Sequence, residues 1–153
     1  MFKLRTILVP TDYSPTSEAA LTYAIDLARL VGATVHVLHA YEIPVYGAPD
    51  TAFIAPPETM AAIKVAAKKG LDTAIAKFQS GGVPLEGHLA EGRAWEAIHD
   101  TAAQVGADLI VIGTHGRRGI ARALLGSVAE KVVRSSKVPV LTVHDDAGEA
   151  RSP

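Results

Sequence analysis

Three glycines and a serine in the last third of the chain are spaced in a way that suits a phosphate group. Two residues separate Gly113 from Gly116, and nine separate Gly116 from the pair Gly126-Ser127, which gives the pattern G-x2-G-x9-G-S. Glycines let backbone N–H groups approach a ligand closely, and the start of a helix adds unpaired N–H donors and the positive end of the helix dipole. The pattern therefore predicts a site that binds a nucleotide through its phosphates.

Residues beside the glycines could complete this site or could act only in the local structure. We expect Arg117, directly after Gly116, to neutralise a phosphate, and His115 to contact the ligand or to act sterically within the loop. Ser127 begins the sequence S-x-x-E, a capping box, so its hydroxyl could cap the helix, bind phosphate, or exchange one partner for the other. Gly113 and Gly116 taken alone could also form only a tight turn. The nine-residue spacer holds three arginines, Arg117, Arg118 and Arg122.

A second polar loop, Pro10-Thr11-Asp12, follows the short apolar run Thr6–Val9. Asp12 is the only acidic residue of this loop, and it could meet a ribose hydroxyl, orient a metal-bound water, or cap a turn. Open parallel sheets bind ligands beside the carboxyl ends of strands, where the strand order reverses. If the first and fourth strands are neighbours, this loop and the glycine loop line one cleft.

Several kinds of catalytic and metal site find no support in the chain. There is no G-x4-G-K-[ST] lysine, no G-x-S-x-G motif and no cysteine. The six histidines predict no metal site, because His36 and His39 read as strand positions and His88 and His99 read as isolated. The sequence favours binding of a nucleotide over its hydrolysis.

The composition is that of one globular domain. The chain has 153 residues, is 48% apolar and carries a net charge of −1, so no basic field indicates nucleic acid and no basic amphipathic run indicates a membrane surface. The N-terminal apolar run is too short for a secretory leader, and no run is long enough to span a membrane. We therefore expect a cytoplasmic protein.

Strand-like and helix-like patterns alternate along the chain, which predicts an α/β fold with a parallel sheet. A domain over residues 1–144 and a disordered tail over 145–153 are expected, with one long proline-rich loop, Tyr41–Pro57. The expected strands are Thr6–Val9, Thr34–Ala40, Leu85–Ala90, Ala107–Ile112 and Val138–Val143. The expected helices are Pro15–Val31, Glu58–Gln79, Ala94–Val105 and Ser127–Ser135.

The last expected strand, Val138–Val143, is apolar on both faces and comes at the end of the chain. These features predict a sheet edge, and an exposed apolar edge invites pairing with a second chain. Pro139 removes one backbone donor without preventing such pairing. We expect a homodimer through this strand.

Four segments resemble the universal stress protein family, and the likeness extends over residues 3–144. G-x2-G-x9-G-[ST] marks the ATP-binding branch of that family, and every fixed position is present. The resemblance implies a single-domain, open five-stranded parallel sheet of order 3-2-1-4-5 with helices on both faces, a Rossmann-like fold. The segments are Ile7–Ser14, Gly106–Gly116, Leu125–Glu130 and Val138–Leu141.

The same resemblance implies a binding site for ATP. The first-strand loop would line the adenine and ribose, the backbone of Ala40 would read the adenine edge, and the glycine pattern would surround the ribose and phosphates. A divalent ion, Mg²⁺ or Mn²⁺, would bridge phosphate oxygens, and family members commonly form dimers through the last strand. The implied site residues are Pro10, Thr11, Asp12, Ala40, Ile112, Gly113, His115, Gly116, Arg117, Gly126, Ser127 and Val128.

Three functions follow from these features. The first is a regulatory protein that binds ATP, hydrolyses it little or not at all, and acts through its nucleotide state on an unidentified protein partner. The second is a slow metal-dependent ATPase or self-phosphorylating protein in which Asp12 or Ser127 assists the chemistry. The third is a nucleotide-free stress adaptor whose glycine loop is only a turn.

Overall fold

The computed structural model describes residues 1–145 except 2, 49 and 116–124. The expected tail therefore lies outside the described residues apart from Asp145. Five strands form the main sheet: β1 (Thr6–Pro10), β2 (Thr34–Tyr41), β5 (Leu85–Glu91), β6 (Leu109–Gly113) and β7 (Val140–Val143). The helices are α1 (Pro15–Val31), α2 (Pro57–Phe78), the short 3₁₀ helix η1 (Gln79–Gly81), α3 (Ala94–Val105) and α4 (Ser127–Ser135).

All strand pairs of the main sheet are parallel, in the order β5-β2-β1-β6-β7. Without the strands of the small hairpin described below, this is the expected order 3-2-1-4-5. The central strand β1 is buried on both faces, with Ile7, Leu8 and Val9 fully inaccessible. A strand covered on both sides is apolar throughout, which is the pattern that its sequence shows.

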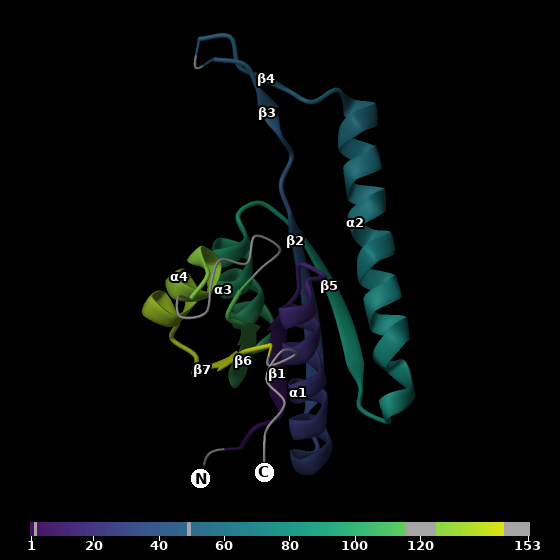
Figure 1. Ribbon diagram of the computed structural model, residues 1–153, viewed down its shortest axis with the longest axis vertical. Helices are drawn as coiled ribbons and strands as arrows, with labels where there is room; N and C mark the ends of the chain where they lie inside the picture. The colour runs from purple at the N-terminus through teal and green to yellow at the C-terminus, as the bar shows by residue number, and fades with distance from the viewer. Residues whose placement is uncertain (2, 49, 116–124, 146–153) are drawn as a thin grey trace.

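Helices cover both faces of the sheet (Figure 1), and an apolar core lies on each face. Alternate residues of β1 point to opposite faces, so Ile7 and Val9 pack with α1 and α2, whereas Leu8 packs with α3 and α4. Helix α1 begins and ends where the sequence predicts. Ser14 accepts a hydrogen bond from the Ser17 amide as the N-cap, and Gly32 closes the helix in the left-handed conformation.

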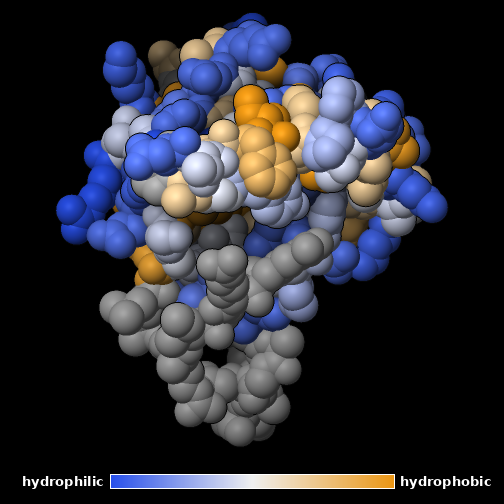
Figure 2. All heavy atoms as spheres, turned by 90° about the horizontal axis from the view of Figure 1, so that it is seen from above, coloured by the Kyte–Doolittle hydropathy of each residue, from blue (hydrophilic) through white to orange (hydrophobic). Residues whose placement is uncertain are grey.

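The segment Tyr41–Pro57, expected as a loop, contains a two-stranded antiparallel hairpin, β3 (Val45–Tyr46) and β4 (Phe53–Ile54). Each strand has two residues, too few to show an alternating pattern in the sequence. The hairpin projects beyond the end of the sheet (Figure 1), and its four apolar side chains are all exposed. Figure 2 looks down on this end of the molecule and shows apolar side chains among hydrophilic ones.

The edge strand β7 begins at Val140, two residues later than expected. Pro139 precedes the strand, and its carbonyl oxygen accepts a hydrogen bond from the Ile110 amide at 2.9 Å. The proline therefore extends the contact with β6 through its carbonyl group. Across the described residues, no helix combines the length and the apolar character that a membrane crossing requires.

Candidate functional site

Both polar loops leave the same edge of the sheet. Strands β1 and β6 are parallel neighbours, with Ile7 opposite Leu109 and Leu8 opposite Ile110. The loop after Pro10 and the loop after Gly113 consequently start at adjacent carboxyl ends. The first and fourth strands of the sheet are therefore neighbours, which was the condition for the two loops to line one cleft.

Thr114 joins the two halves of the glycine pattern. It is fully buried, its amide donates to the Val143 carbonyl at 2.9 Å, and its own carbonyl accepts from the Gly126 amide at 2.6 Å. Its Oγ1 lies 3.0 Å from Nδ1 of His115 and 3.1 Å from Nδ1 of His144. Sequence reasoning did not single out Thr114, although a hydroxyl directly after a wholly apolar strand is a signal that could have marked it.

Gly113 is required by the packing of α1 against β6. A Cβ at this position would lie 2.9 Å from the backbone carbonyl carbon and oxygen of Thr16, in the first turn of α1. Because backbone atoms cannot move aside as a side-chain end can, only glycine allows this close approach. The glycine thus brings the first-strand loop, which leads into α1, against the start of the glycine loop.

Helix α4 begins at Ser127, one residue earlier than a capping box on Ser127 would place it. Gly126 is the N-cap, with no side-chain hydrogen bond to the first turn, and its carbonyl accepts from the Glu130 amide. Of the roles considered for Ser127, capping of the helix is not the one that the structure shows, because Gly126 is the N-cap in an extended conformation and Glu130 pairs with Arg134 at 3.1 Å. Ser127 is exposed at the helix start, and Val128 packs against the α3/α4 core.

The first-strand loop is held by its own side chains. Thr11 donates its amide to the Leu38 carbonyl at 2.8 Å, and its Oγ1 accepts from the Tyr13 amide at 3.0 Å. Asp12 Oδ1 accepts from the amide of Ser14 at 3.0 Å. Of the roles considered for Asp12, stabilisation of the turn is thus present in the structure.

Tyr13 and His39 are contributors that the sequence analysis missed. Tyr13 has a positive φ of 64°, an uncommon conformation for a bulky residue, and its ring stacks on His39 with centroids 4.4 Å apart. Its hydroxyl donates to the Ala67 carbonyl in α2 at 3.1 Å, while Nδ1 of His39 lies 2.9 Å from the Thr11 carbonyl oxygen. The loop after β1 is therefore linked to β2 and α2.

The remaining predicted residues fall at the same edge or outside the described chain. Pro10 ends β1, Ile112 is buried in β6 just before Gly113, and Ala40 is partly buried near the end of β2. Nε2 of His115 is buried and has no hydrogen-bond partner among the described residues. Gly116 and Arg117 lie outside the described residues, as do Arg118 and Arg122.

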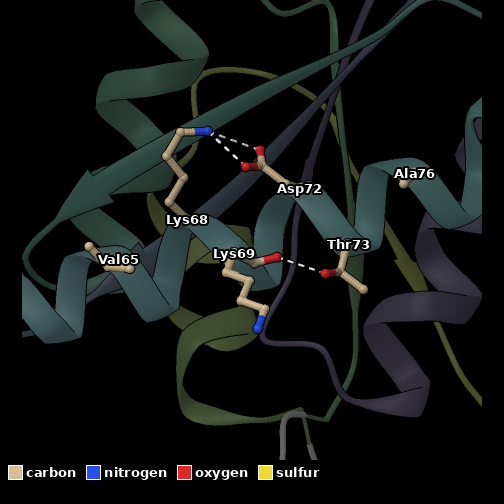
Figure 3. Close-up of a pocket in the computed structure, with 6 residues that line it drawn as sticks. All are labelled: Val65, Lys68, Lys69, Asp72, Thr73 and Ala76. Atoms are coloured by element: carbon tan, nitrogen blue, oxygen red, sulfur yellow. Dashed lines mark hydrogen bonds and ion pairs between the residues drawn. The ribbon is translucent and has the colours of Figure 1, made fainter.

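A hollow lies along α2 (Figure 3), and none of its lining residues belongs to either polar loop. Three of its polar side chains are already paired, since Lys68 donates to both oxygens of Asp72 and Thr73 donates to the Lys69 carbonyl. All its lining residues belong to one helix, so no second element forms an opposing wall. They are Val65, Lys68, Lys69, Asp72, Thr73 and Ala76.

The prediction that the histidines form no metal site is at odds with the position of two of them. Nδ1 of His36 lies 2.8 Å from Nε2 of His88, and Glu86 stands beside both rings. Burial, and to a lesser extent the neighbouring His36, lowers the pKa of His88 below its usual value, while Glu86 opposes this shift. His99, also expected to be isolated, has Nε2 2.8 Å from the hydroxyl of Ser135.

Solved structures of similar shape cover most of the chain. Universal stress protein UspA from Lactobacillus plantarum superposes with a TM-score of 0.77 at 26% identity, covering 94% of this chain and 99% of its own. A universal stress protein in complex with cAMP, at 29% identity, gives 0.69, and one from Archaeoglobus fulgidus in complex with dAMP, at 28% identity, gives 0.66. Each covers 94% of this chain and 99% of its own.

Sequence relatives belong to the same family as these structures. Universal stress protein MJ0531 of Methanocaldococcus jannaschii is 33% identical over 138 residues, covering 90% of this chain and 80% of the relative. A universal stress protein of Thermus aquaticus is 38% identical over 145 residues, covering 94% of this chain and all of the relative. The sequence model of the Universal stress protein family matches residues 3–144. The chain therefore belongs to the universal stress protein family.

Proposed function

We propose that this protein is a cytoplasmic regulator that binds ATP, hydrolyses it little or not at all, and acts on a protein partner through its nucleotide state. The observation that carries the proposal is the 2.6 Å hydrogen bond from the Gly126 amide to the Thr114 carbonyl. It holds the N-terminus of α4, which has no side-chain cap, beside the carboxyl end of β6. Amide donors and the positive end of the helix dipole would then face a phosphate at the sheet edge.

The proposed site places the two ends of the nucleotide on different loops. Pro10, Thr11 and Asp12 would line the ribose and adenine, and the backbone of Ala40 would read the adenine edge. Towards the phosphates, Ile112 and Gly113 lead into the loop, and Gly126, Ser127 and Val128 start the helix. His115 would contribute its buried Nε2 as a partner for the ligand. We assign Gly116 and Arg117 to the same site from the motif alone.

Two of the related structures support a nucleotide, rather than another anion, as the ligand of the proposed site. The proteins solved with cAMP and with dAMP share 29% and 28% identity with this chain and the same fold. Both ligands are adenine nucleotides, which agrees with the preference for adenine proposed here. A Mg²⁺ or Mn²⁺ ion would be held mainly through the phosphate oxygens, since these ions prefer oxygen ligands and retain several waters.

A regulator also fits the residues that surround the proposed phosphates. The glycine pattern has no Walker-type lysine to stabilise charge on a transferred phosphoryl group. Asp12, the acidic residue of the first-strand loop, already stabilises the turn into α1 through its Oδ1. Release of phosphate from ATP in the presence of Mg²⁺ should therefore stay at the level of protein-free buffer. ATP hydrolysis by the unaltered chain that disappears in Asp12→Ala would favour the slow ATPase over the regulator.

Ser127→Glu tests the binding site without weakening its helix. A carboxylate at the start of a helix interacts favourably with the dipole, so α4 should keep its stability. The same carboxylate would occupy and repel the proposed phosphate position. The control is Val133→Glu, which adds the same charge to an exposed position later in α4.

The test measures equilibrium binding of ATP and of GTP to both variants and to the unaltered chain. We expect ATP to bind the unaltered chain and Val133→Glu with similar affinity, more tightly than GTP, and to bind Ser127→Glu at least tenfold more weakly. Equal ATP affinity in the two variants would show that the start of α4 does not contact the nucleotide. Absence of ATP binding to the unaltered chain would favour the nucleotide-free adaptor.

We also propose that two copies pair through β7, over the segment Val138–Val143. The strand lies at the edge of the sheet and is only partly buried in the single chain. Edge strands offer unpaired backbone groups to a second strand, and apolar side chains beside them favour the association. The proposed nucleotide site would lie next to this edge, because the Val143 carbonyl accepts from the Thr114 amide.

A further inference from the structure

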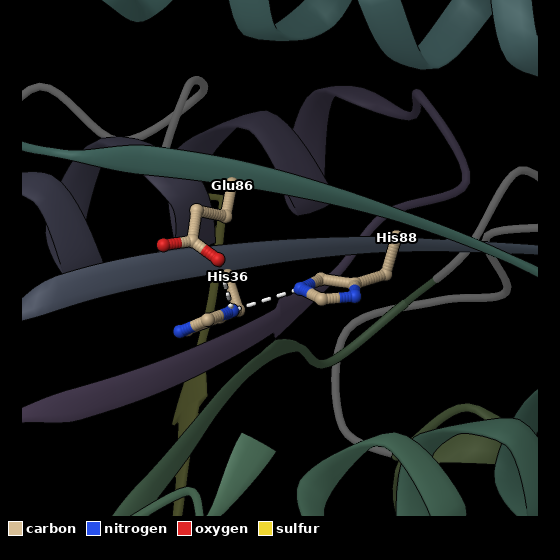
Figure 4. A group of neighbouring side chains, drawn as sticks. All are labelled: His36, Glu86 and His88. Carbon is tan, nitrogen blue, oxygen red and sulfur yellow. Dashed lines mark hydrogen bonds and ion pairs between the residues drawn. The ribbon is translucent and has the colours of Figure 1, made fainter. Parts of the chain in front are cut away.

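Three side chains of types that can ligate a metal converge on the edge strand β5 and its neighbour β2 (Figure 4). His36 comes from β2, and Glu86 and His88 come from β5. In the parallel register, His36 lies opposite Glu86, and Leu38 lies opposite His88. Because strand residues two apart share a face, all three side chains stand on the face that carries the α3/α4 core.

The donor atoms are already close together. Nδ1 of His36 lies 2.8 Å from Nε2 of His88 and 3.6 Å from Oε2 of Glu86, and the three donors all lie within 4.8 Å of one another. Tetrahedral zinc with Zn–N bonds of about 2.0–2.1 Å sets its ligand nitrogens about 3.3 Å apart. The two rings would need to separate by about half an ångström to admit the ion, since their present contact is a hydrogen bond.

The surroundings of the cluster suit an ion that enters from solvent. The His36 side chain is 11% exposed, so its ring is held by the sheet, whereas the Glu86 side chain is 62% exposed and can adjust its carboxylate. His88 is partly buried, and its ring is tilted 33° from that of His36. Two rings held by the sheet and one adjustable carboxylate leave further coordination positions to water.

We propose that His36, Glu86 and His88 form a binding site for a divalent transition-metal ion of the zinc class. Two imidazole nitrogens and one carboxylate oxygen match the ligands of Zn²⁺ and Co²⁺, whereas Mg²⁺ prefers oxygen ligands in an octahedral arrangement. The bound ion would join the edge strand β5 to β2. It would thereby stabilise the outer part of the sheet.

This site is separate from the proposed nucleotide site. His36 precedes Ala40 by four residues in β2, which corresponds to about 13 Å along a strand at about 3.3 Å per residue. The cluster therefore lies back along the sheet from the carboxyl edge where the two loops meet. The ion proposed to accompany ATP would be bound by phosphates, so the two metal sites differ in place and in ligand chemistry.

The proposal can be tested by isothermal titration calorimetry. The full chain, untagged and treated with EDTA, is titrated with Zn²⁺ alone. We expect one ion per chain, not displaced by excess Mg²⁺, and visible absorption bands of tetrahedral geometry when Co²⁺ replaces Zn²⁺. At a zinc concentration 100 times the Kd, the Tm should rise by roughly 5–10 °C. A chain that binds no Zn²⁺ at micromolar concentrations overturns the assignment.

Variants identify the ligands. His36→Gln and His88→Gln should each weaken zinc binding at least tenfold, and Glu86→Gln, at an exposed position, should weaken it without affecting folding. The control is His99→Gln, because His99 contacts Ser135 outside the cluster. Binding that survives all three cluster variants, or falls equally in the control, contradicts the site. Ser127→Glu should keep full zinc affinity, so this test and that of ATP binding can fail independently.

Discussion

The amide of Gly126 donates a hydrogen bond to the carbonyl oxygen of Thr114, with nitrogen and oxygen 2.6 Å apart. These residues lie on opposite sides of the nine-residue spacer, so the bond closes the glycine loop at its base. Thr114 in turn donates to the Val143 carbonyl at the end of β7. The glycine loop, the start of α4 and the edge strand are thus held at one buried residue.

Thr114→Val should weaken ATP binding while leaving the fold intact. Valine matches threonine in shape and keeps both backbone hydrogen bonds, but it removes the hydroxyl that contacts His115 and His144. We expect a loss of about 1 kcal/mol in the free energy of unfolding, as for other buried hydrogen bonds, and a severalfold lower ATP affinity as His115 loses its position. Urea unfolding and equilibrium binding measure the two effects.

The control for Thr114→Val is Thr73→Val. That hydroxyl donates to the Lys69 carbonyl on the exposed side of α2, so its removal should leave ATP affinity unchanged. If Thr114→Val binds ATP as tightly as the control, the hydroxyl has no part in arranging the loop.

Gly113→Ala should destabilise the protein more than Gly87→Ala. Both glycines lie in strands, and an added Cβ would meet the backbone of Thr16 at 2.9 Å in the first case and Cδ1 of Ile75 at 2.5 Å in the second. The Ile75 methyl can rotate away, whereas α1 would have to move from β6. We expect a cost of about 1–3 kcal/mol for Gly113→Ala and a smaller one for Gly87→Ala, measured by urea unfolding. The opposite ranking would mean that α1 shifts easily.

Thr142→Pro should separate the proposed dimer. The carbonyls of Pro139 and Val143 point towards β6, so by alternation the backbone groups of Thr142 point towards the outer edge. Proline there removes a donor available to a second chain and leaves the β6 contacts in place. Light scattering should give about twice the 16.0 kDa chain mass for the unaltered protein and a single chain mass for the variant.

Thr142→Val, which keeps the backbone donor, serves as the control and should remain dimeric. If Thr142→Pro remains dimeric, the interface lies on another surface of the protein. A monomeric unaltered chain at micromolar concentration would contradict the dimer altogether.

Features set by neighbours in the chain could be predicted from the sequence. Ser14 and Pro15 begin α1, and Gly32 ends it, because capping and proline geometry depend on residues within one turn. The same local reasoning failed for Ser127. A serine three residues before a glutamate satisfies a capping box, which would start α4 at Val128. In the structure Gly126, whose amide donates to the Thr114 carbonyl, is the N-cap, so α4 starts one residue earlier.

Contacts between distant segments could not be predicted in the same way. Tyr13 and His39 stack because β1 and β2 are neighbours, and no local pattern marks the pair. His36 and His88 lie 52 residues apart, and each alone reads as an ordinary strand residue. Their contact depends on the pairing and the register of β2 with β5.

The sequence by itself determined the alternation of strands and helices and the spacing of the glycine pattern, because periodicity and capping act over a few residues. Likeness to a family added the strand order, which the structure bears out. Only the tertiary structure decided that Thr114 holds the glycine loop and that His36, Glu86 and His88 share one face of the sheet. Those relationships arise from strand register and side-chain packing, which bring together residues that no local pattern connects.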